Sequence, residues 1–214
     1  MPEATGKAWA GARISFIPIL SATFRCWARR VPVETLRRFW TMLAHSQGGF
    51  LNAVKLAAGL GVSGLSVARY LDLMVDLMLV RRLSPWHANK GKRLVKSPKV
   101  HIRDAGLAHA LLGPETYEDL LGHPVVGDSW EGFCIENLIG AAPRGSEASL
   151  YRSSDGAEID LLLTLPGGAI WAIEVRRTTL AKVTRGFHGA ADELGAAERL
   201  LVYAGGREIQ GQEG

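Results

Sequence analysis

The sequence has few cysteines and lacks a hydrophobic run long enough to cross a bilayer. Cys26 and Cys134 match no CxxC or His/Cys ligand spacing, which argues against a disulfide framework or a structural zinc site. The uncharged segment 14–24 contains Pro18 and falls well short of the roughly 20 residues of a membrane-spanning helix. Glu3 and the lack of a clear small-residue cleavage site argue against a secretion signal. These absences predict a cytoplasmic protein without a membrane anchor.

Catalytic signatures built on histidine, serine or cysteine are also missing. The six histidines show no HExxH or other paired-ligand spacing, and the sequence contains no GxSxG motif. Zinc-dependent hydrolysis and acyl transfer by these routes are therefore not predicted. The net charge of +4 and the isoelectric point near 9.3 permit an acidic partner such as nucleic acid without requiring one.

The sequence contains enough apolar residues to form a hydrophobic core. Its 214 residues are 47% hydrophobic, which suits one large domain or two small ones. Helical spacing of apolar residues predicts helices at 33–45, 52–60 and 64–79, with Ser63 placed to cap the third. The tight turn at 61–63 between the last two is typical of a helix-turn-helix.

A β-hairpin is predicted after these helices. Residues 80–104 carry an Asn-Lys-Gly turn region between short strand-like runs. Three helices followed by such a hairpin predict a winged helix, and with a further helix at 104–112 this domain covers residues 33–112. Residues 1–32 match no pattern and stay unassigned.

A second, α/β domain is predicted at 128–214, after a Gly- and Pro-containing connector at 113–127 that holds one short helix. Its element order is α-β-β-β-α-β, which makes a compact α/β unit. The expected elements are a helix at 128–139, strands at 150–152, 158–165, 169–176 and 199–203, and a helix at 182–194.

The most distinctive charged residues lie on two neighbouring strands of this second domain. Because residues i and i+2 of a strand point to the same face, Glu158 and Asp160 share one side, as do Glu174 and Arg176. Two carboxylates about 4 Å apart repel by about 4 kcal/mol at an effective dielectric constant of about 20. Either Mg²⁺ held by the carboxylates, which would activate water against a phosphodiester, or Arg176 itself would offset this repulsion.

Three stretches of the chain together carry a family resemblance. They are "PWHANKGKRLVKSPKVHIRDAGLAHALLG", "HPVVGDSWEGFCIENLI", and "YRSSDGAEIDLLL" followed by "AIEVRRT". From about residue 33 onward the chain resembles domain of unknown function 4143, the C-terminal half of a group of bacterial and archaeal AAA+ ATPases.

The resemblance implies a fold and a set of site residues. The C-terminal unit of that family is similar to the PD-(D/E)xK nuclease fold, which uses a helix Glu, a strand Asp and an acid-x-Lys on the next strand. Glu131, Asp160 and Glu174 match these positions, and Glu158 lies beside them. The implied catalytic residues are therefore Glu131, Asp160, Glu174 and Arg176, and the implied Mg²⁺ ligands are Asp160, Glu174 and Glu158.

The chain departs from the family pattern in two places. Arg176 stands where the family usually has Lys, and a guanidinium stays protonated, so it cannot act as a base; it is suited to a phosphate or to clamping Glu174 or Asp160. The upstream P-loop GxxxxGK[ST] is reduced to Thr5-Gly6-Lys7-Ala8. We therefore expect no ATP site in this chain, and an ATPase domain or subunit is a candidate partner in trans.

The predicted hairpin gathers cations next to Trp86 and His87. A wing of this kind would lie along DNA phosphates, whereas a solvated hairpin surface is the plainer interpretation. The candidate nucleic-acid-binding residues are Lys90, Lys92, Arg93, Lys96 and Lys99.

Three functional hypotheses remain open at this point. The leading one is an accessory, DNA-associating module of an AAA+ ATPase-type protein, with a degenerate nuclease-like site. The second is an active Mg²⁺-dependent nuclease that uses the acids named above. The third is a protein-interaction scaffold with neither DNA binding nor catalysis.

Overall fold

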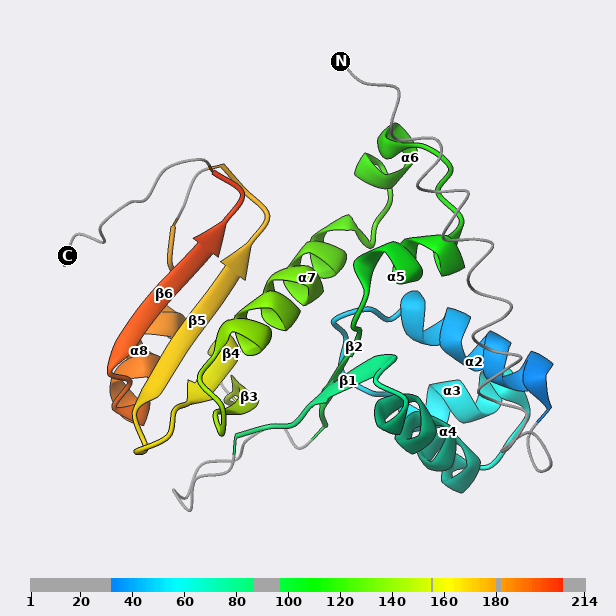
Figure 1. The fold of residues 1–214 in the computed structure, drawn as a ribbon, viewed down its shortest axis with the longest axis horizontal. Coiled ribbons are helices and arrows are strands. Elements are labelled where there is room, and N and C mark those ends of the chain that lie inside the picture. The colour runs from blue at the N-terminus through cyan, green and yellow to red at the C-terminus, as the bar shows by residue number, and fades with distance from the viewer. Residues whose placement is uncertain (1–31, 87–96, 155, 180–181, 206–214) are drawn as a thin grey trace. The chain divides into compact units, whose positions relative to one another are not determined.

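The chain folds into two compact units of helices and small sheets (Figure 1). The structure is a computed structural model, and it describes residues 32–86, 97–154, 156–179 and 182–205. The first unit contains the residues up to Ser84 and those from Lys96 to Asn137, and the second contains Pro85–Val95 and Leu138–Gly214.

The first unit is mainly helical. It holds most of the predicted helices close to their expected positions, together with one short two-stranded sheet. Its elements are α2 (Val33–Ala44), α3 (Ala53–Leu60), α4 (Gly64–Asp76), β1 (Val80–Leu83), β2 (Lys99–Ile102), α5 (Ala105–Leu112), α6 (Tyr117–Leu121) and the greater part of α7 (Val126–Ala141).

Polar caps determine where three of these helices begin. The side chains of Asn52, Ser63 and Asp104 accept backbone N–H groups from Lys55, Ser66 and Leu107, which satisfies donors that the first helical turn leaves open. The predicted capping role of Ser63 is thus confirmed. Gly61 ends α3 in the left-handed conformation with φ of 67°, which makes the tight turn before α4.

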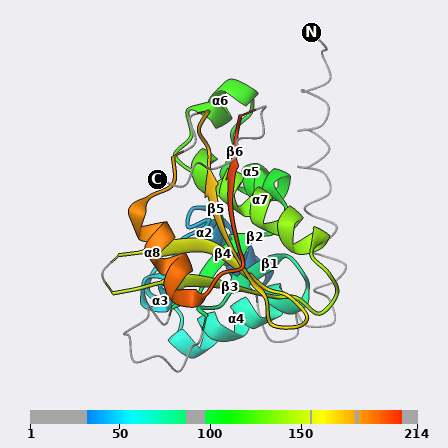
Figure 2. The same ribbon diagram turned by 90° about the vertical axis from the view of Figure 1, so that its left-hand side faces the viewer.

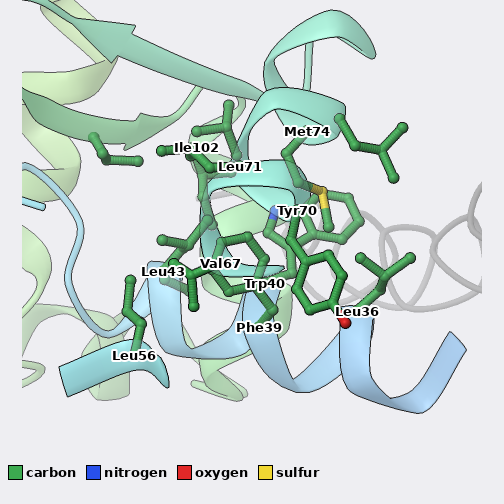
Figure 3. Packing of buried hydrophobic residues seen from close by; sticks show 14 of the residues in the cluster. Leu36, Phe39, Trp40, Leu43, Leu56, Val67, Tyr70, Leu71, Met74 and Ile102 are labelled. Atoms are coloured by element: carbon green, nitrogen blue, oxygen red, sulfur yellow. The ribbon is translucent and has the colours of Figure 1, made fainter. Parts of the chain in front are cut away.

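The core of the first unit lies between α2 and α4 (Figure 3). Leu36, Phe39 and Trp40 of α2 are almost completely buried against the α4 side chains Val67, Tyr70, Leu71 and Met74. Burying one such large apolar side chain contributes about 1.5 to 3 kcal/mol. The helical apolar spacing read from the sequence therefore corresponds to real buried faces.

The predicted hairpin is present as an antiparallel pair, β1 and β2. Its register joins Val80 to Ile102 and Leu83 to Lys99. Residues 87–96 lie outside the described residues, so the predicted Asn-Lys-Gly turn stays a prediction. The first 31 residues of the chain also lie outside the described residues.

The second unit is a four-stranded sheet with one helix on a face. The strands β3 (Glu147–Arg152), β4 (Glu158–Thr164), β5 (Ile170–Arg176) and β6 (Glu198–Tyr203) lie side by side in that order. The first two neighbouring pairs are antiparallel, and β5 and β6 are parallel. Parallel neighbours need a crossover, which α8 (Arg185–Leu194) supplies.

Helix α8 covers one face of this sheet (Figure 2). Phe187, Ala190, Ala191 and Leu194 recur at helical spacing and pack on buried side chains of β3, β4 and β5. These contacts form the core of the second unit. The antiparallel ladder between β4 and β5 brings the acids of these two strands together.

A mixed α/β fold with two sheets is confirmed, and the differences from the sequence predictions are at element ends. Helix α8 begins at Arg185 rather than 182, because the Thr184 hydroxyl caps its first turn. Helix α4 ends at Asp76 rather than 79, and Met78 follows in the left-handed conformation with φ of 60°. Among the helices of the described residues, none has the length and apolar character to cross a membrane.

Candidate functional site

The acids of β4 and β5 meet one guanidinium. Asp160 and Glu174 are buried, with 4% and 2% of their side chains exposed, whereas Arg176 keeps 43% exposed. Arg176 Nη2 donates to Glu174 Oε1, and its Nη1 lies 3.9 Å from Asp160 Oδ2. We call these three residues the strand cluster. Its guanidinium offsets the repulsion between two buried carboxylates.

Asp160 also has a backbone role. The β4–β5 ladder runs from Leu161 to Thr164 on β4. Just before it, the Asp160 Oδ2 atom accepts the backbone N–H of Val175 at 3.0 Å. The carboxylate therefore satisfies a buried donor on β5 and holds that strand end next to β4.

Glu158 is oriented toward a different cation. It lies opposite Arg152 of β3 in the strand register, and its Oε2 is 3.4 Å from Arg152 Nη1. Both side chains are partly exposed, so the ion pair adds little stability. The structure thus brings Asp160, Glu174 and Arg176 together, while Glu158 pairs with Arg152.

The strand cluster, in this conformation, does not fit a divalent cation. One oxygen of each carboxylate is already engaged, Asp160 Oδ2 by a backbone N–H and Glu174 Oε1 by Arg176. Mg²⁺ requires near-octahedral oxygen ligands, and the guanidinium occupies the position next to both carboxylates. In the described part of the chain, no group of three or more His, Cys, Asp or Glu could hold a metal ion.

Glu131, the predicted helix acid, belongs to the first unit and has a partner there. Lys99 Nζ donates to Glu131 Oε1 at 3.0 Å, and only 7% of the lysine side chain is exposed. Lys99 is also one of the predicted nucleic-acid contacts, and the structure places it on β2 with its ammonium turned inward to a carboxylate. The other hairpin cations, Lys90, Lys92, Arg93 and Lys96, lie outside the described residues.

Glu136 is a second, partly buried acid of α7, and the sequence gives no sign of its structural role. Glu136 of α7 accepts hydrogen bonds from Arg81 of β1 and from Arg103, which follows β2. Burial alone would raise the pKa of Glu136, but the hydrogen bonds and charges of the two guanidiniums outweigh it and lower the pKa. Together with Lys99 and Glu131, these residues form what we call the hairpin–helix cluster.

His101 of β2 lies in the same unit, in close contact with Gly132 of α7. His101 is fully buried, and neither ring nitrogen has a hydrogen-bond partner among the described residues. Burial, followed by the charge of Lys99, lowers its pKa to about 3. A Cβ atom on Gly132 would lie 3.1 Å from His101 Nδ1 and 2.8 Å from Gln47 Nε2, so this α7 position has no room for a side chain.

The alternation on β2 is the signal that could have revealed this cluster. Lys99, His101 and Arg103 follow one another at i, i+2 spacing, which places them on one side of the strand. Gln47 supports the same strand, since its amide donates to the Ile102 carbonyl and accepts the Ile102 N–H. No sequence pattern predicts the contact between Gln47 and Ile102.

A pocket of about 400 Å³ lies at the C-terminal end of α2. Its walls are largely apolar, with polar groups from His45, Ser46, Asn52 and Lys55. None of the predicted site residues lines it.

Comparisons with known proteins divide the chain into two matches. The family model described as "Domain of unknown function (DUF8612)" matches residues 15–118, and that described as "Domain of unknown function (DUF4143)" matches residues 126–214. The resemblance expected from about residue 33 is therefore found from residue 126 onward.

Two curated mycobacterial proteins are similar to the chain over most of its length. They are "Uncharacterized protein Rv2008c" of Mycobacterium tuberculosis and "Uncharacterized protein Mb2031c" of Mycobacterium bovis, each 40% identical over 176 residues. The match covers 82% of this chain and 40% of each relative, so the chain spans less than half the length of these relatives. No solved structure matches the chain.

Proposed function

We propose that the chain, whose residues 126–214 match the DUF4143 family model, is a DNA-associating accessory module of an AAA+ ATPase-type protein. In this proposal α2–α4 and the β1–β2 pair act as a cytoplasmic winged helix. The second unit corresponds to a PD-(D/E)xK-like arrangement whose cutting site is degenerate.

The position of Arg176 carries the proposal. Its guanidinium contacts both Asp160 and Glu174, the two buried acids that a nuclease of this type would direct at a metal ion. Arginine cannot deprotonate a water molecule, because it stays protonated at any physiological pH. The chemistry that remains available to the strand cluster is binding of an anion by the exposed side of the guanidinium.

Two further features support association with DNA and with a motor. The chain is basic, with a net charge of +4, and the hairpin sequence around residues 90–96 concentrates that charge. The mycobacterial relatives extend well beyond the matched region, and that extra length has room for a separate ATPase domain. We propose that such a domain supplies the ATP chemistry.

A combined cleavage and binding experiment tests this function. The full chain is incubated with supercoiled, linear duplex and single-stranded DNA in the presence of Mg²⁺ or Mn²⁺, and binding is measured in parallel at low salt. We expect salt-sensitive binding and no cleavage. The Asp160→Ala and Glu174→Ala variants serve as the matched controls.

Each contrary result identifies one of the other hypotheses. Cleavage that both Ala substitutions abolish would make the protein an active metal-dependent nuclease. Absence of binding to every DNA form at low salt would favour a protein-interaction scaffold.

A further inference from the structure

The connection between β5 and α8 is the most one-sided stretch of charge in the second unit. From Val175 to Ala191 the chain contains no Asp or Glu. Four cations lie in the same interval, namely Arg176, Arg177, Lys182 and Arg185. Such a segment repels other cations and attracts anions over a distance of about 8 to 10 Å at ordinary salt.

Three of these cations are available to a partner. Arg177, Lys182 and Arg185 are exposed, and none forms an ion pair with a carboxylate among the described residues. Two other arginines of the same unit are already engaged, since Arg152 pairs with Glu158 and Arg199 pairs with Asp192. The charge of the β5–α8 connection is therefore the less compensated part of this surface.

The described residues at the two ends of the connection are held in place. The Thr178 carbonyl accepts the N–H of Ala204, just after β6, at 3.1 Å. Val183 packs against the core beneath α8, and Thr184 caps the helix by accepting the N–H of Phe187. Lys182 and Arg185 consequently flank an anchored residue pair, which lowers the conformational entropy that binding would cost.

The surface around these cations suits phosphate better than an apolar protein partner. Within the described residues, the exposed large hydrophobic side chains all belong to the first unit. Protein interfaces usually contain an apolar or aromatic centre, which this part of the second unit does not offer. Phosphate binding relies instead on Arg and Lys, and the N-terminus of the ten-residue helix α8 adds a favourable dipole.

We propose that Arg177, Lys182 and Arg185 contact the phosphate backbone of nucleic acid, next to the exposed guanidinium of Arg176. This inference rests on the proposed DNA-associating function and adds to it a second set of contact residues, distinct from those of the basic hairpin. Phosphate contacts of this kind fix the register of the nucleic acid without reading its bases. The nucleic acid would then pass along the strand cluster without being cut.

The test is the salt dependence of duplex binding by the full chain. Affinity for a fluorescein-labelled duplex is measured by anisotropy from about 50 to about 200 mM salt, the range over which phosphate contacts change affinity most visibly. The variant is the triple substitution R177Q/K182Q/R185Q. Each lost phosphate contact lowers the steepness of the log-log salt slope by about 0.9, so we expect a reduction of about 2.7.

Arg144→Gln is the matched control. Arg144 is exposed in the same unit, but its neighbour Gly145 lies beside Pro166 of the β4–β5 turn, at the opposite end of β5 from the β5–α8 connection. This variant should bind like the unsubstituted chain. A second comparison, K90Q/K92Q/R93Q, reports on the hairpin alone, and circular dichroism verifies that every variant is folded.

The outcomes separate this inference from the function on which it rests. If the triple variant keeps the parent slope and affinity while the hairpin variant binds more weakly, the inference is wrong and the DNA-associating function stands. Equal weakening per removed charge in Arg144→Gln would also overturn it, because net charge alone would then explain the effect. If the unsubstituted chain does not bind duplex DNA at low salt, both proposals fail.

Discussion

The hairpin–helix cluster of the first unit and the strand cluster of the second balance buried charge in different ways. In the first, Arg81, Lys99 and Arg103 meet Glu131 and Glu136, so cations outnumber acids. In the second, Arg176 alone meets Asp160 and Glu174. The first cluster joins elements far apart in the sequence, whereas the second joins the ends of adjacent strands.

The two clusters differ in how exposed their cations are. Lys99 is almost fully buried with its acid, so no ligand can reach the pair without breaking the contact between β2 and α7. Arg176 covers two buried acids and leaves nearly half of its own side chain in solvent. An acid on a helix near a basic strand is thus a packing element in one unit, and an arginine on a strand is a potential anion contact in the other.

The largest effect is expected when the hairpin–helix cluster loses its shared acid. Glu136→Ala leaves Arg81 and Arg103 partly buried without a counter-charge. We expect the free energy of unfolding to fall by about 3 kcal/mol, the lower end of the range for breaking a buried ion pair. Urea unfolding followed by tryptophan fluorescence measures it.

Asp72→Ala is the control for that substitution. It removes the ion pair with Arg82, in which the Asp72 side chain is 58% exposed, and should cost less than about 1 kcal/mol. Equal losses in the two variants would mean that the hairpin–helix cluster is no more stabilising than a surface pair.

A smaller effect is expected when the strand cluster loses its cation. Arg176→Gln leaves Asp160 and Glu174 buried close to the same point, and we expect a loss of about 2 kcal/mol because solvent screens the exposed guanidinium. Adding Glu174→Gln should restore part of that loss, since it removes one of the repelling charges. Strict additivity in this double-mutant cycle would show that the residues do not interact.

The smallest expected change, counted per pH unit, is a pH dependence of the stability of the first unit. His101 stays neutral in the folded protein down to its pKa of about 3, whereas the unfolded chain binds a proton below about pH 6.5. The contribution of neutral His101 to the free energy of unfolding is therefore fully present above pH 6.5. It is lost as the pH decreases toward 3, by up to about 1.4 kcal/mol per pH unit. Urea midpoints between pH 7 and 5 measure the slope.

His101→Leu provides the comparison for this slope. The substitution removes the titrating ring, so the slope of the free energy of unfolding against pH should decrease by up to the contribution of one proton, about 1.4 kcal/mol per pH unit. An unchanged slope would assign the pH dependence to groups other than His101.

Most of the secondary structure can be predicted from the sequence, because it depends on interactions between residues that are close together in the chain. Apolar periodicity at 33–45 and capping by Ser63 depend only on nearby residues, so α2 and α4 were found within a few positions. The approach of Asp160 to Arg176 was also readable, because i, i+2 alternation fixes the face of each strand.

Burial of charge was not readable in the same way. The sequence groups Lys99 with the hairpin cations because it lies in a basic run, but its partner Glu131 comes from a helix 32 residues later in the chain. Whether a lysine points to solvent or to such a partner depends on which side of β2 packs on α7. That choice is made by tertiary packing, including the glycine at 132 that lets the helix approach His101.

The central claim is that Arg176 does for Asp160 and Glu174 what a metal ion would do in a nuclease. Calorimetric titration of the unaltered chain with Mg²⁺ tests this directly. The account predicts no saturable binding at millimolar Mg²⁺. Saturable binding that disappears in both the Asp160→Asn and the Glu174→Gln variants would contradict it.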